Sequence, residues 1–346
     1  LNKTNVYILD INSLASNVGI FNWYDPKYWN VAKVAFSMKY IPIFSEYVCR
    51  ILSSSLGRSR RVLVLDLDNT CWGGVIGDDG IDGILIGHGD PTAEAHLAIQ
   101  KLALELRARG IVLAVSSKNE ENIALEPFKS HPDMVLKEDH IAVFHANWKD
   151  KASNIRQISE KLSLGLDSFV FLDDNPAERM QVRSELPQVA VPELPDDPAV
   201  YPSILVSAGY FEAVGFSDED SKRADFYSAN LKREAISSNA SNMEEYLQSL
   251  NMEVIFNNFD EIGRPRIFQL ISKSNQFNLT TKRYTENEIT KFQNDDNFFT
   301  RQIRLTDCFG DNGMISVLIC KKDKNDWLID TWLMSCRVLE RKVEYA

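Results

Sequence analysis

Residues 61–74 constrain the fold more than any other part of the chain, because a short apolar run ends there in two carboxylates. Val62–Leu65 is apolar without a break, which is typical of a strand buried on both faces of a parallel sheet. Asp66 and Asp68 follow at its carboxyl end, where open α/β sheets bind ligands. Their side chains would point to the same side and repel one another unless a cation lay between them, and Mg²⁺ is the simplest such cation. Asp-x-Asp alone is also typical of a turn, so the rest of the sequence must distinguish a metal site from a simple turn.

Strands and helices alternate after this stretch. The apolar spacing predicts a helix over residues 91–109, a buried strand over 111–115, a helix over 151–162 and a strand over 169–172. This alternation is typical of a doubly wound parallel sheet. The strands end in polar residues suited to phosphate and metal, and we expect the substrate to contact Thr70, Ser116, Lys118, Asn119 and Asn175.

Composition excludes several classes of protein. The chain has 346 residues, and Asp and Glu outnumber Lys and Arg by 49 to 38, for a net charge of −11. A chain this acidic, without a long basic run, is not expected to bind nucleic acid. The five cysteines form no Cys-x-x-Cys pair, which argues against a disulfide scaffold or structural zinc. The sequence shows no signal peptide and no membrane-spanning stretch, so we expect a cytoplasmic protein without a membrane partner.

Three segments are predicted along the chain. Residues 1–58 would pack on the following domain or be the remnant of a larger one, with a strand at 5–11 and helical spacing over 29–52. Residues 59–205 would form the parallel-sheet domain, with a tight hairpin or flap at 77–83 and a proline-rich linker or extended wrap at its end. Residues 206–346 would form a second α/β domain, with strands at 315–320 and 327–334.

Four motifs occur in the order found in the haloacid dehalogenase superfamily of phosphotransferases. They are Asp66-Leu-Asp-Asn-Thr70, Ser117, Lys151 and Asp173-Asp174. The sequence around these motifs and in the second half of the chain is similar to the FkbH-like family. The similar segments are Trp72-Gly-Gly-Val-Ile-Gly-Asp-Asp-Gly80, Ser117-Lys-Asn119, Asp173-Asp-Asn-Pro-Ala-Glu-Arg179, Asn275-Gln-Phe-Asn-Leu-Thr-Thr281 and Ser335-Cys-Arg337. The resemblance covers nearly the whole chain. It implies a haloacid dehalogenase-like domain followed by an acetyltransferase-like domain.

The resemblance also implies an activity. FkbH-like proteins load a glyceryl unit in polyketide biosynthesis. They take 1,3-bisphosphoglycerate, move its acyl group to an enzyme thiol, remove the remaining phosphate and pass the glyceryl group to the phosphopantetheine thiol of an acyl carrier protein. The expected partners are therefore 1,3-bisphosphoglycerate and an acyl carrier protein. Two other functions stay open: a plain phosphatase of small phosphoesters, and an inactive module that binds a carrier.

The resemblance assigns roles to the motif residues. Asp66 would be the nucleophile and Asp68 the general acid and base. Ser117 and Lys151 would hold the phosphoryl oxygens, although Lys149 is a rival for Lys151. Mg²⁺ would bind Asp66, the backbone of Asp68 and Asp174, with Asp173 as the less favoured alternative. Thr70 and Asp173 would orient their neighbours.

The acyl acceptor is predicted to be Cys71, which directly follows Thr70. A thiolate there would lie close to the acyl carbon, but an unpaired cysteine is also commonly a buried apolar residue, and nearby carboxylates disfavour a thiolate. Cys336 is the rival. Glu340 and Lys342 stand where an acetyltransferase loop would have glycines, which argues against independent acetyl-CoA chemistry and leaves carrier docking or a structural role. Residues 276–281 would line a pocket or form a capped turn.

Overall fold

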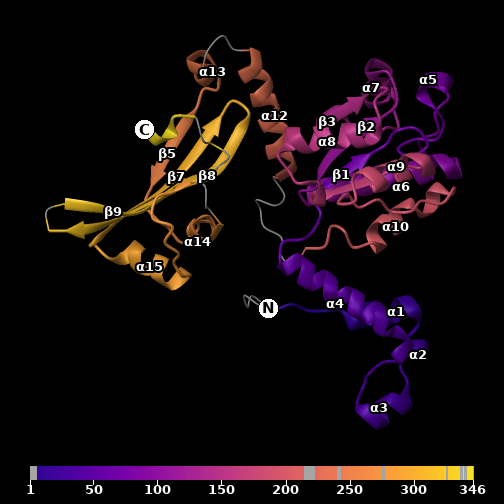
Figure 1. Ribbon diagram of the computed structural model, residues 1–346, viewed down its shortest axis with the longest axis horizontal. Helices are drawn as coiled ribbons and strands as arrows, with labels where there is room; N and C mark the ends of the chain where they lie inside the picture. The colour runs from indigo at the N-terminus through magenta and orange to yellow at the C-terminus, as the bar shows by residue number, and fades with distance from the viewer. Residues whose placement is uncertain are drawn as a thin grey trace. The chain divides into compact units, whose positions relative to one another are not determined.

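The computed structural model describes residues 6–213, 223–239, 243–273, 277–324, 326–335, 338 and 341–345. The chain divides into two compact units, Leu1–Ser228 and Ala229–Ala346, and Figure 1 labels most of their helices and strands. The limits expected for three segments, at residues 58 and 205, stay predictions. No helix within the described ranges has both the length and the hydropathy that crossing a bilayer requires.

The first unit begins with short helices: α1 (Ile11–Val18), α2 (Ile20–Trp23), α3 (Pro26–Ala32) and α4 (Ile41–Ser55). The strand predicted at residues 5–11 is wrong over the described residues 6–10, which form no strand. Asp10 accepts a hydrogen bond from the amide of Ser13 at 3.0 Å and so caps α1. The helical stretch predicted for 29–52 is interrupted at Lys33, whose φ of 56° is left-handed.

A parallel sheet forms the centre of this unit. Its strands are β1 (Val62–Leu65), β2 (Val112–Ser117), β3 (Ile141–Ala146) and β4 (Phe169–Leu172), in the order β3-β2-β1-β4. β1 and β4 are buried along their whole length, as their apolar runs predict. The chain moves outward from β1 to β3 and then returns to the other side of β1, so the topological switch point lies between β1 and β4. The predicted doubly wound α/β fold is confirmed.

Helices connect these strands: α6 (Pro91–Ala108), α7 (Glu121–Ser130), α8 (Lys151–Leu162) and α9 (Pro176–Glu185). α6 packs on β2 and on α10 (Tyr201–Ser207), while α8 packs on β2, β3 and α9. Polar caps set where α8 and α9 begin. Asp150 accepts from the Ser153 amide at 2.8 Å, and Asn175 accepts from the Ala177 amide at 2.9 Å. The first residue of α8 is therefore Lys151, and α9 begins directly after the polar end of β4.

Two connections lie beside the sheet. Between β1 and α6 the chain forms a flap, residues 73–85, which contains the short helix α5 (Ile76–Asp79) and is closed by backbone pairing of Gly73 with Leu85. The proline-rich segment after α9 runs extended along β4, since the amide of Phe171 donates to the carbonyl of Ala190 at 2.9 Å. The flap and the extended wrap were each one of the two alternatives that the turn residues and the prolines predicted.

The second unit is an antiparallel sheet. Its strands are β5 (Glu253–Asn257), β6 (Phe277–Asn278), β7 (Phe298–Asp307), β8 (Gly310–Asp323) and β9 (Asp326–Met334), in the order β5-β7-β8-β9-β6. α14 (Arg264–Lys273) and α15 (Glu286–Asn294) pack on it. α13 (Met243–Ser249) precedes β5, and α12 (Arg223–Asn239) runs across the boundary of the units. The strands expected at 315–320 and 327–334 lie within β8 and β9. The likeness of this unit to an acetyltransferase stays a prediction.

Candidate active site

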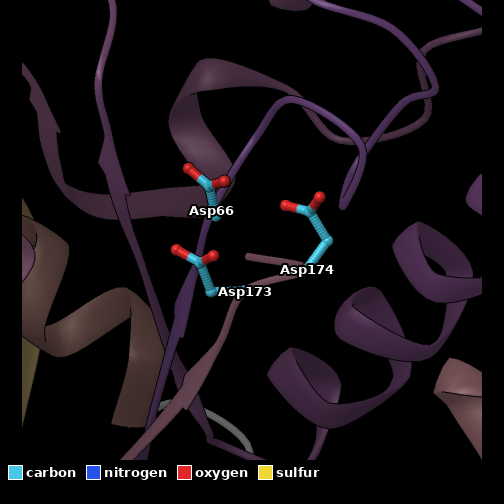
Figure 2. Close-up of side chains that lie close together, drawn as sticks. All are labelled: Asp66, Asp173 and Asp174. Atoms are coloured by element: carbon cyan, nitrogen blue, oxygen red, sulfur yellow. The ribbon is translucent and has the colours of Figure 1, made fainter. Parts of the chain in front are cut away.

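Strand register brings Asp66 and Asp173 side by side. Leu65 of β1 pairs with Leu172 of β4, and the amide of Asp66 donates to the carbonyl of Leu172 at 2.9 Å. The residue after each strand is an aspartate, so two carboxylates lie at the same edge of the sheet, at the switch point where such folds bind ligands. Asp174 follows directly and completes the group (Figure 2).

The three carboxylates fit a divalent cation. Asp66, Asp173 and Asp174 each offer an oxygen, and these oxygens lie within 4.8 Å of one another. Burial, and then the charge of Asp66, raise the pKa of Asp173 to about 7 and the pKa of Asp174 to about 6. Carboxylate oxygens are the ligands that hard divalent ions prefer. A bound cation would offset the repulsion by Asp66, which adds to the effect of burial on both pKa values.

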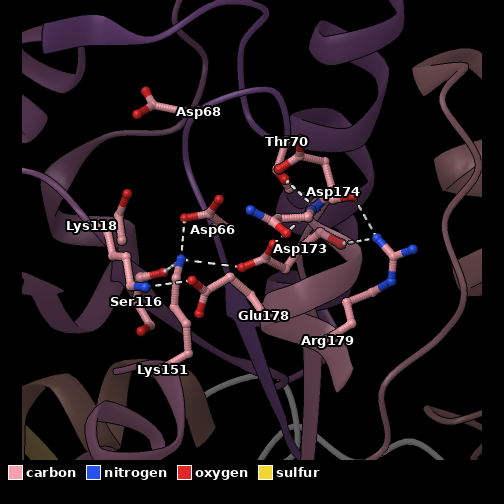
Figure 3. Close-up of polar contacts among 12 residues, drawn as sticks. Asp66, Asp68, Thr70, Ser116, Lys118, Lys151, Asp173, Asp174, Glu178 and Arg179 are labelled. Atoms are coloured by element: carbon pink, nitrogen blue, oxygen red, sulfur yellow. Dashed lines mark hydrogen bonds and ion pairs between the residues drawn. The ribbon is translucent and has the colours of Figure 1, made fainter. Parts of the chain in front are cut away.

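Lys151 supplies the one ammonium in contact with this group among the described residues. Its Nζ lies 2.5 Å from Asp66 Oδ1 and 3.2 Å from Asp173 Oδ2, and it donates to the carbonyl of Ser116 at 2.8 Å (Figure 3). Burial alone would lower the pKa of Lys151, but the charges of Asp66 and Asp173 outweigh it and the pKa is raised. The lysine is therefore charged. Its sequence rival, Lys149, is exposed.

Asp68 is turned away from the carboxylate group. Its Oδ1 accepts from the Trp72 indole Nε1 at 2.9 Å and from the Ile76 amide at 3.0 Å, and its Oδ2 accepts from the Asn119 Nδ2 at 2.8 Å. Its carboxylate is not among the oxygens that could share the ion. Three donors hold its side chain against the flap, so it would have to rotate to reach a group bound at the three carboxylates.

Ser117 and Asn119 lie at the end of β2. The Ser117 hydroxyl accepts from Asn119 Nδ2 at 3.1 Å, and both side chains are buried. Asn119, expected to contact the substrate, thus lies between the hydroxyl proposed to hold phosphate and the carboxylate of Asp68. Its substrate role stays a prediction, while its contact with Asp68 gives it a positioning role that the sequence did not indicate.

Thr70 and Arg179 hold the backbone of the β4 end. The amide of Asp174 donates to Thr70 Oγ1 at 3.2 Å. Arg179 Nη1 donates to the carbonyls of Asp173 at 2.9 Å and of Asp174 at 2.5 Å. The sequence placed Arg179 within a motif without giving it a role. The sequence could have indicated this role, because Arg179 lies one turn into α9 and a side chain at that position can reach back to the preceding loop.

Cys71 lies in the turn after β1 with its side chain buried at 1% exposure. Its Sγ donates to the carbonyl of Asp66 at 3.2 Å. Burial, and then the charges of Asp66 and Asp68, raise the pKa of the thiol well above its usual range. The thiol shown here is protonated and hydrogen-bonded to the backbone, which is the opposite of an activated nucleophile. Its role as acyl acceptor stays a prediction, and its rival Cys336 lies outside the described residues.

The rim of the site carries an ion pair that sequence analysis missed. Lys118 Nζ lies 2.5 Å from Glu178 Oε1, and this contact joins the loop after β2 to the first turn of α9 (Figure 3). Lys118, expected to contact the substrate, is therefore neutralised by a carboxylate here. Asn175, expected to contact the substrate too, caps α9 and is exposed.

The predicted features of the second unit are only partly described. Residues 274–276, 336, 337, 339 and 340 lie outside the described residues. In the part that is described, Asn278 Oδ1 accepts from the amide of Thr281 at 2.9 Å, which is the capped turn expected as one alternative.

The chain is similar to a solved structure described as the N-terminal part of the protein BF1531 from Bacteroides fragilis, containing a phosphatase domain complexed with Mg. The two are 45% identical with a TM-score of 0.56, and the match covers 59% of this chain and 54% of that chain. The chain therefore spans about half the length of that structure. A putative HAD superfamily (subfamily III A) hydrolase from Legionella pneumophila matches at 16% identity and a TM-score of 0.28, over 59% of this chain and 98% of that chain, and so remote a likeness carries no weight. No protein-family model and no curated protein matches the chain.

Proposed function

We propose that this chain is a Mg²⁺-dependent phosphotransferase of the haloacid dehalogenase type in which Asp66 accepts a phosphoryl group. The observation that carries the proposal is the convergence of Asp66, Asp173, Asp174 and Lys151, which come from three separate segments, around one small space. The similar structure from B. fragilis is described as a phosphatase domain complexed with Mg, which supports both the metal and the class of reaction.

The residues have complementary roles in such a reaction. A carboxylate oxygen of Asp66 forms a bond to phosphorus while the bond to the leaving oxygen breaks, and that oxygen takes a proton from Asp68. Water then attacks the phosphorus and gives its proton to Asp68, so that phosphate is released and the Asp66 carboxylate is restored. Lys151 and Ser117 hold phosphoryl oxygens throughout.

Asp66 and Asp174 would hold Mg²⁺, with Asp173 within reach. The ion, when bound, supplies positive charge beside the phosphoryl oxygens. All three carboxylates lie close enough to share an ion, and the place of Asp174 in the Asp173-Asp174 motif favours it as the ligand. This choice between the two neighbours stays part of the proposal.

The finer activity is that of the FkbH-like family. We infer that the substrate is 1,3-bisphosphoglycerate, that the glyceryl group passes through an enzyme cysteine, and that it ends on an acyl carrier protein of polyketide biosynthesis. The sequence motifs support this inference, and they extend into the second unit. If Cys71 is the acceptor, its hydrogen bond to Asp66 O must open before the thiol can lose its proton.

Intact-protein mass spectrometry tests the proposal. The protein is incubated with 1,3-bisphosphoglycerate, Mg²⁺ and a phosphopantetheinylated carrier, and phosphate release is followed in parallel. We expect a glyceryl adduct on the enzyme and then on the carrier, both dependent on Mg²⁺. Asp66→Asn should abolish phosphate release, while Asp139→Asn, which changes a carboxylate that is 77% exposed and outside the site, should not.

The other outcomes separate the alternatives. Phosphate release from several phosphoesters without a mass change on the enzyme would identify a plain phosphatase with the same nucleophile. A protein that binds no Mg²⁺, and in which Asp66→Asn changes no product, would be an inactive carrier-binding module. Either result would overturn the glyceryl-transfer proposal, and the second would also overturn the phosphotransferase proposal.

A further inference from the structure

Helix α6 carries a buried histidine that the proposed chemistry does not use. His96 is 3% exposed, and its Nδ1 lies 3.0 Å from the carbonyl oxygen of Thr70. A carbonyl oxygen only accepts hydrogen bonds, so Nδ1 must carry the proton. Burial lowers the pKa of His96, so the ring is neutral at neutral pH, with Nε2 unprotonated.

Thr70 connects this histidine to the metal group. Its carbonyl accepts from His96. Its hydroxyl Oγ1 accepts from the amide of Asp174 at 3.2 Å (Figure 3). Thr70 is completely buried, so water does not replace either contact. A continuous path of hydrogen bonds therefore runs from α6, through one residue, to the backbone of a metal-binding carboxylate.

The imidazole ring is held on its opposite edge as well. A Cβ placed on Gly73 would lie 3.2 Å from His96 Nε2 and 3.1 Å from Leu85 Cβ. A side chain at this position would press on the ring and on Leu85, and glycine avoids this crowding where the ring packs against the flap. With one edge bonded to Thr70 and the other packed on Gly73, the ring has little freedom to rotate.

We propose that His96 is a positioning residue that sets the place of Asp174 through Thr70. The carboxylate of Asp174 must lie close to that of Asp66 for one ion to bind both, and the Thr70 hydroxyl holds the Asp174 backbone at that distance. The role rests on the proposed Mg²⁺ site. It concerns the position of Asp174, which Mg²⁺ affinity and hydrogen exchange can test without any catalysed reaction.

Two substitutions separate the effect of the His96 hydrogen bond from the effect of the volume of its side chain. His96→Asn keeps an N–H donor, because Asn Nδ2 is bonded to Cγ as His Nδ1 is, whereas His96→Leu fills the space without a donor. Outer-shell partners of metal ligands change metal affinity by about 10–100-fold, and because His96 acts one residue further out we expect about a 10-fold rise in the Mg²⁺ dissociation constant for His96→Leu. His96→Asn should stay within about 2-fold of the unaltered protein. Gln100, which donates to the carbonyl of Cys71 at 2.8 Å, still anchors the turn in both variants.

A double-mutant cycle tests the route through Thr70. Thr70→Val removes the hydroxyl that accepts from Asp174 and leaves the carbonyl that accepts from His96. If His96 acts through Thr70, adding His96→Leu to Thr70→Val should change the Mg²⁺ affinity little further. Independent, additive losses would overturn the proposed route.

Titration calorimetry with Mg²⁺ and hydrogen exchange of the metal-free full-length protein complete the test. Exchange at the Asp174 amide should speed up in His96→Leu and not in His96→Asn. Leu106→Ala, a core truncation on the same helix, controls for general loss of stability and should leave Mg²⁺ affinity unchanged. If the unaltered protein binds no Mg²⁺, the proposed function fails, yet the exchange result still decides the inference. Equal exchange and equal affinity in His96→Leu and the unaltered protein would overturn it.

Discussion

Replacing Lys151 by methionine removes the only ammonium that contacts the carboxylate group in the described chain. Lys151 is 2% exposed, and its Nζ lies 2.5 Å from Asp66 and 3.2 Å from Asp173. Removing one partner of a buried ion pair costs about 3–5 kcal/mol, because the other charge stays buried without compensation. Methionine has nearly the volume of the lysine stem, so a cavity contributes little. We therefore expect the free energy of unfolding of metal-free protein to fall by about 3–5 kcal/mol at pH 8.

The decrease in the free energy of unfolding caused by Lys151→Met should be smaller at lower pH. The folded pKa of Asp173 is raised to about 7, above its usual value of 3.8, so the folded state binds protons that the unfolded state releases. Stability from this group is therefore present at low pH and is lost as the pH rises through about 7. Lys151 lowers the pKa of Asp173, so the variant moves that pKa further up. At pH 5 the Asp173 carboxyl is protonated in the variant and needs no ammonium, so only the ion pair with Asp66 is lost and we expect a smaller cost than at pH 8.

Urea unfolding with a chelator, at pH 5 and pH 8, measures both values. Hydrogen exchange of peptides from β1 and β4 reports on the first unit alone. Lys149→Met is the matched control, because it removes an exposed lysine two residues upstream. Equal stability of the two variants at pH 8, or a loss in Lys151→Met that does not depend on pH, would refute the electrostatic account of the site.

Four further outcomes follow from the same geometry. Trp72→Phe removes the indole donor to Asp68, and it should lower kcat for phosphate release and reduce the free energy of unfolding by about 1.5 kcal/mol. Mg²⁺ affinity should not change, and a loss of Mg²⁺ binding would contradict this. Mg²⁺ affinity should fall from pH 8 to pH 5, because protons on Asp173 and Asp174 compete with the ion, and calorimetry in buffers of different ionisation enthalpy should detect their release. A maleimide should label the exposed Cys49 and Cys308 of native protein and spare Cys71 until urea is added. Inorganic phosphate should bind measurably more tightly with Mg²⁺ than with a chelator, and equal affinities would argue against a shared site.

The parallel-sheet unit was predictable because its signals are local. The apolar runs at Val62–Leu65 and Phe169–Leu172 became β1 and β4 with the predicted ends, and the helix at Lys151–Leu162 begins and ends where expected. Each run is bounded by charged or polar residues, so burial alone specifies its ends. The strand expected at residues 5–11 failed because a short apolar run, here residues 6–9, also fits an irregular segment, while Asp10 caps the helix that begins at Ile11.

The contacts within the site were less predictable. That Asp66 and Asp173 would meet follows from the rule for parallel sheets, and the structure places them together with Asp174 and Lys151. The direction in which a side chain turns depends on donors that are distant in sequence. Asn119 lies 51 residues from the Asp68 that it holds, and His96 lies 26 residues from Thr70. No spacing rule connects such residues, because their contact depends on how α6 and β2 pack.

Charge balance determines the order in which this site can be filled. Asp66, Asp173 and Asp174 carry three negative charges when ionised, Lys151 carries one positive charge, and the remaining deficit matches one divalent cation. Burial, and then the charge of Asp66, raise the pKa values of Asp173 and Asp174, so the deficit adds to the effect of burial. Lys118 does not reduce it, since Glu178 neutralises it at the rim. A phosphoryl dianion that approached first would meet like charge in a poorly solvated space, where repulsion is strong. We therefore expect the cation to bind before the substrate or together with it. Burial, and then the charges of Asp66 and Asp68, keep the thiol of Cys71 protonated in the turn beside this group.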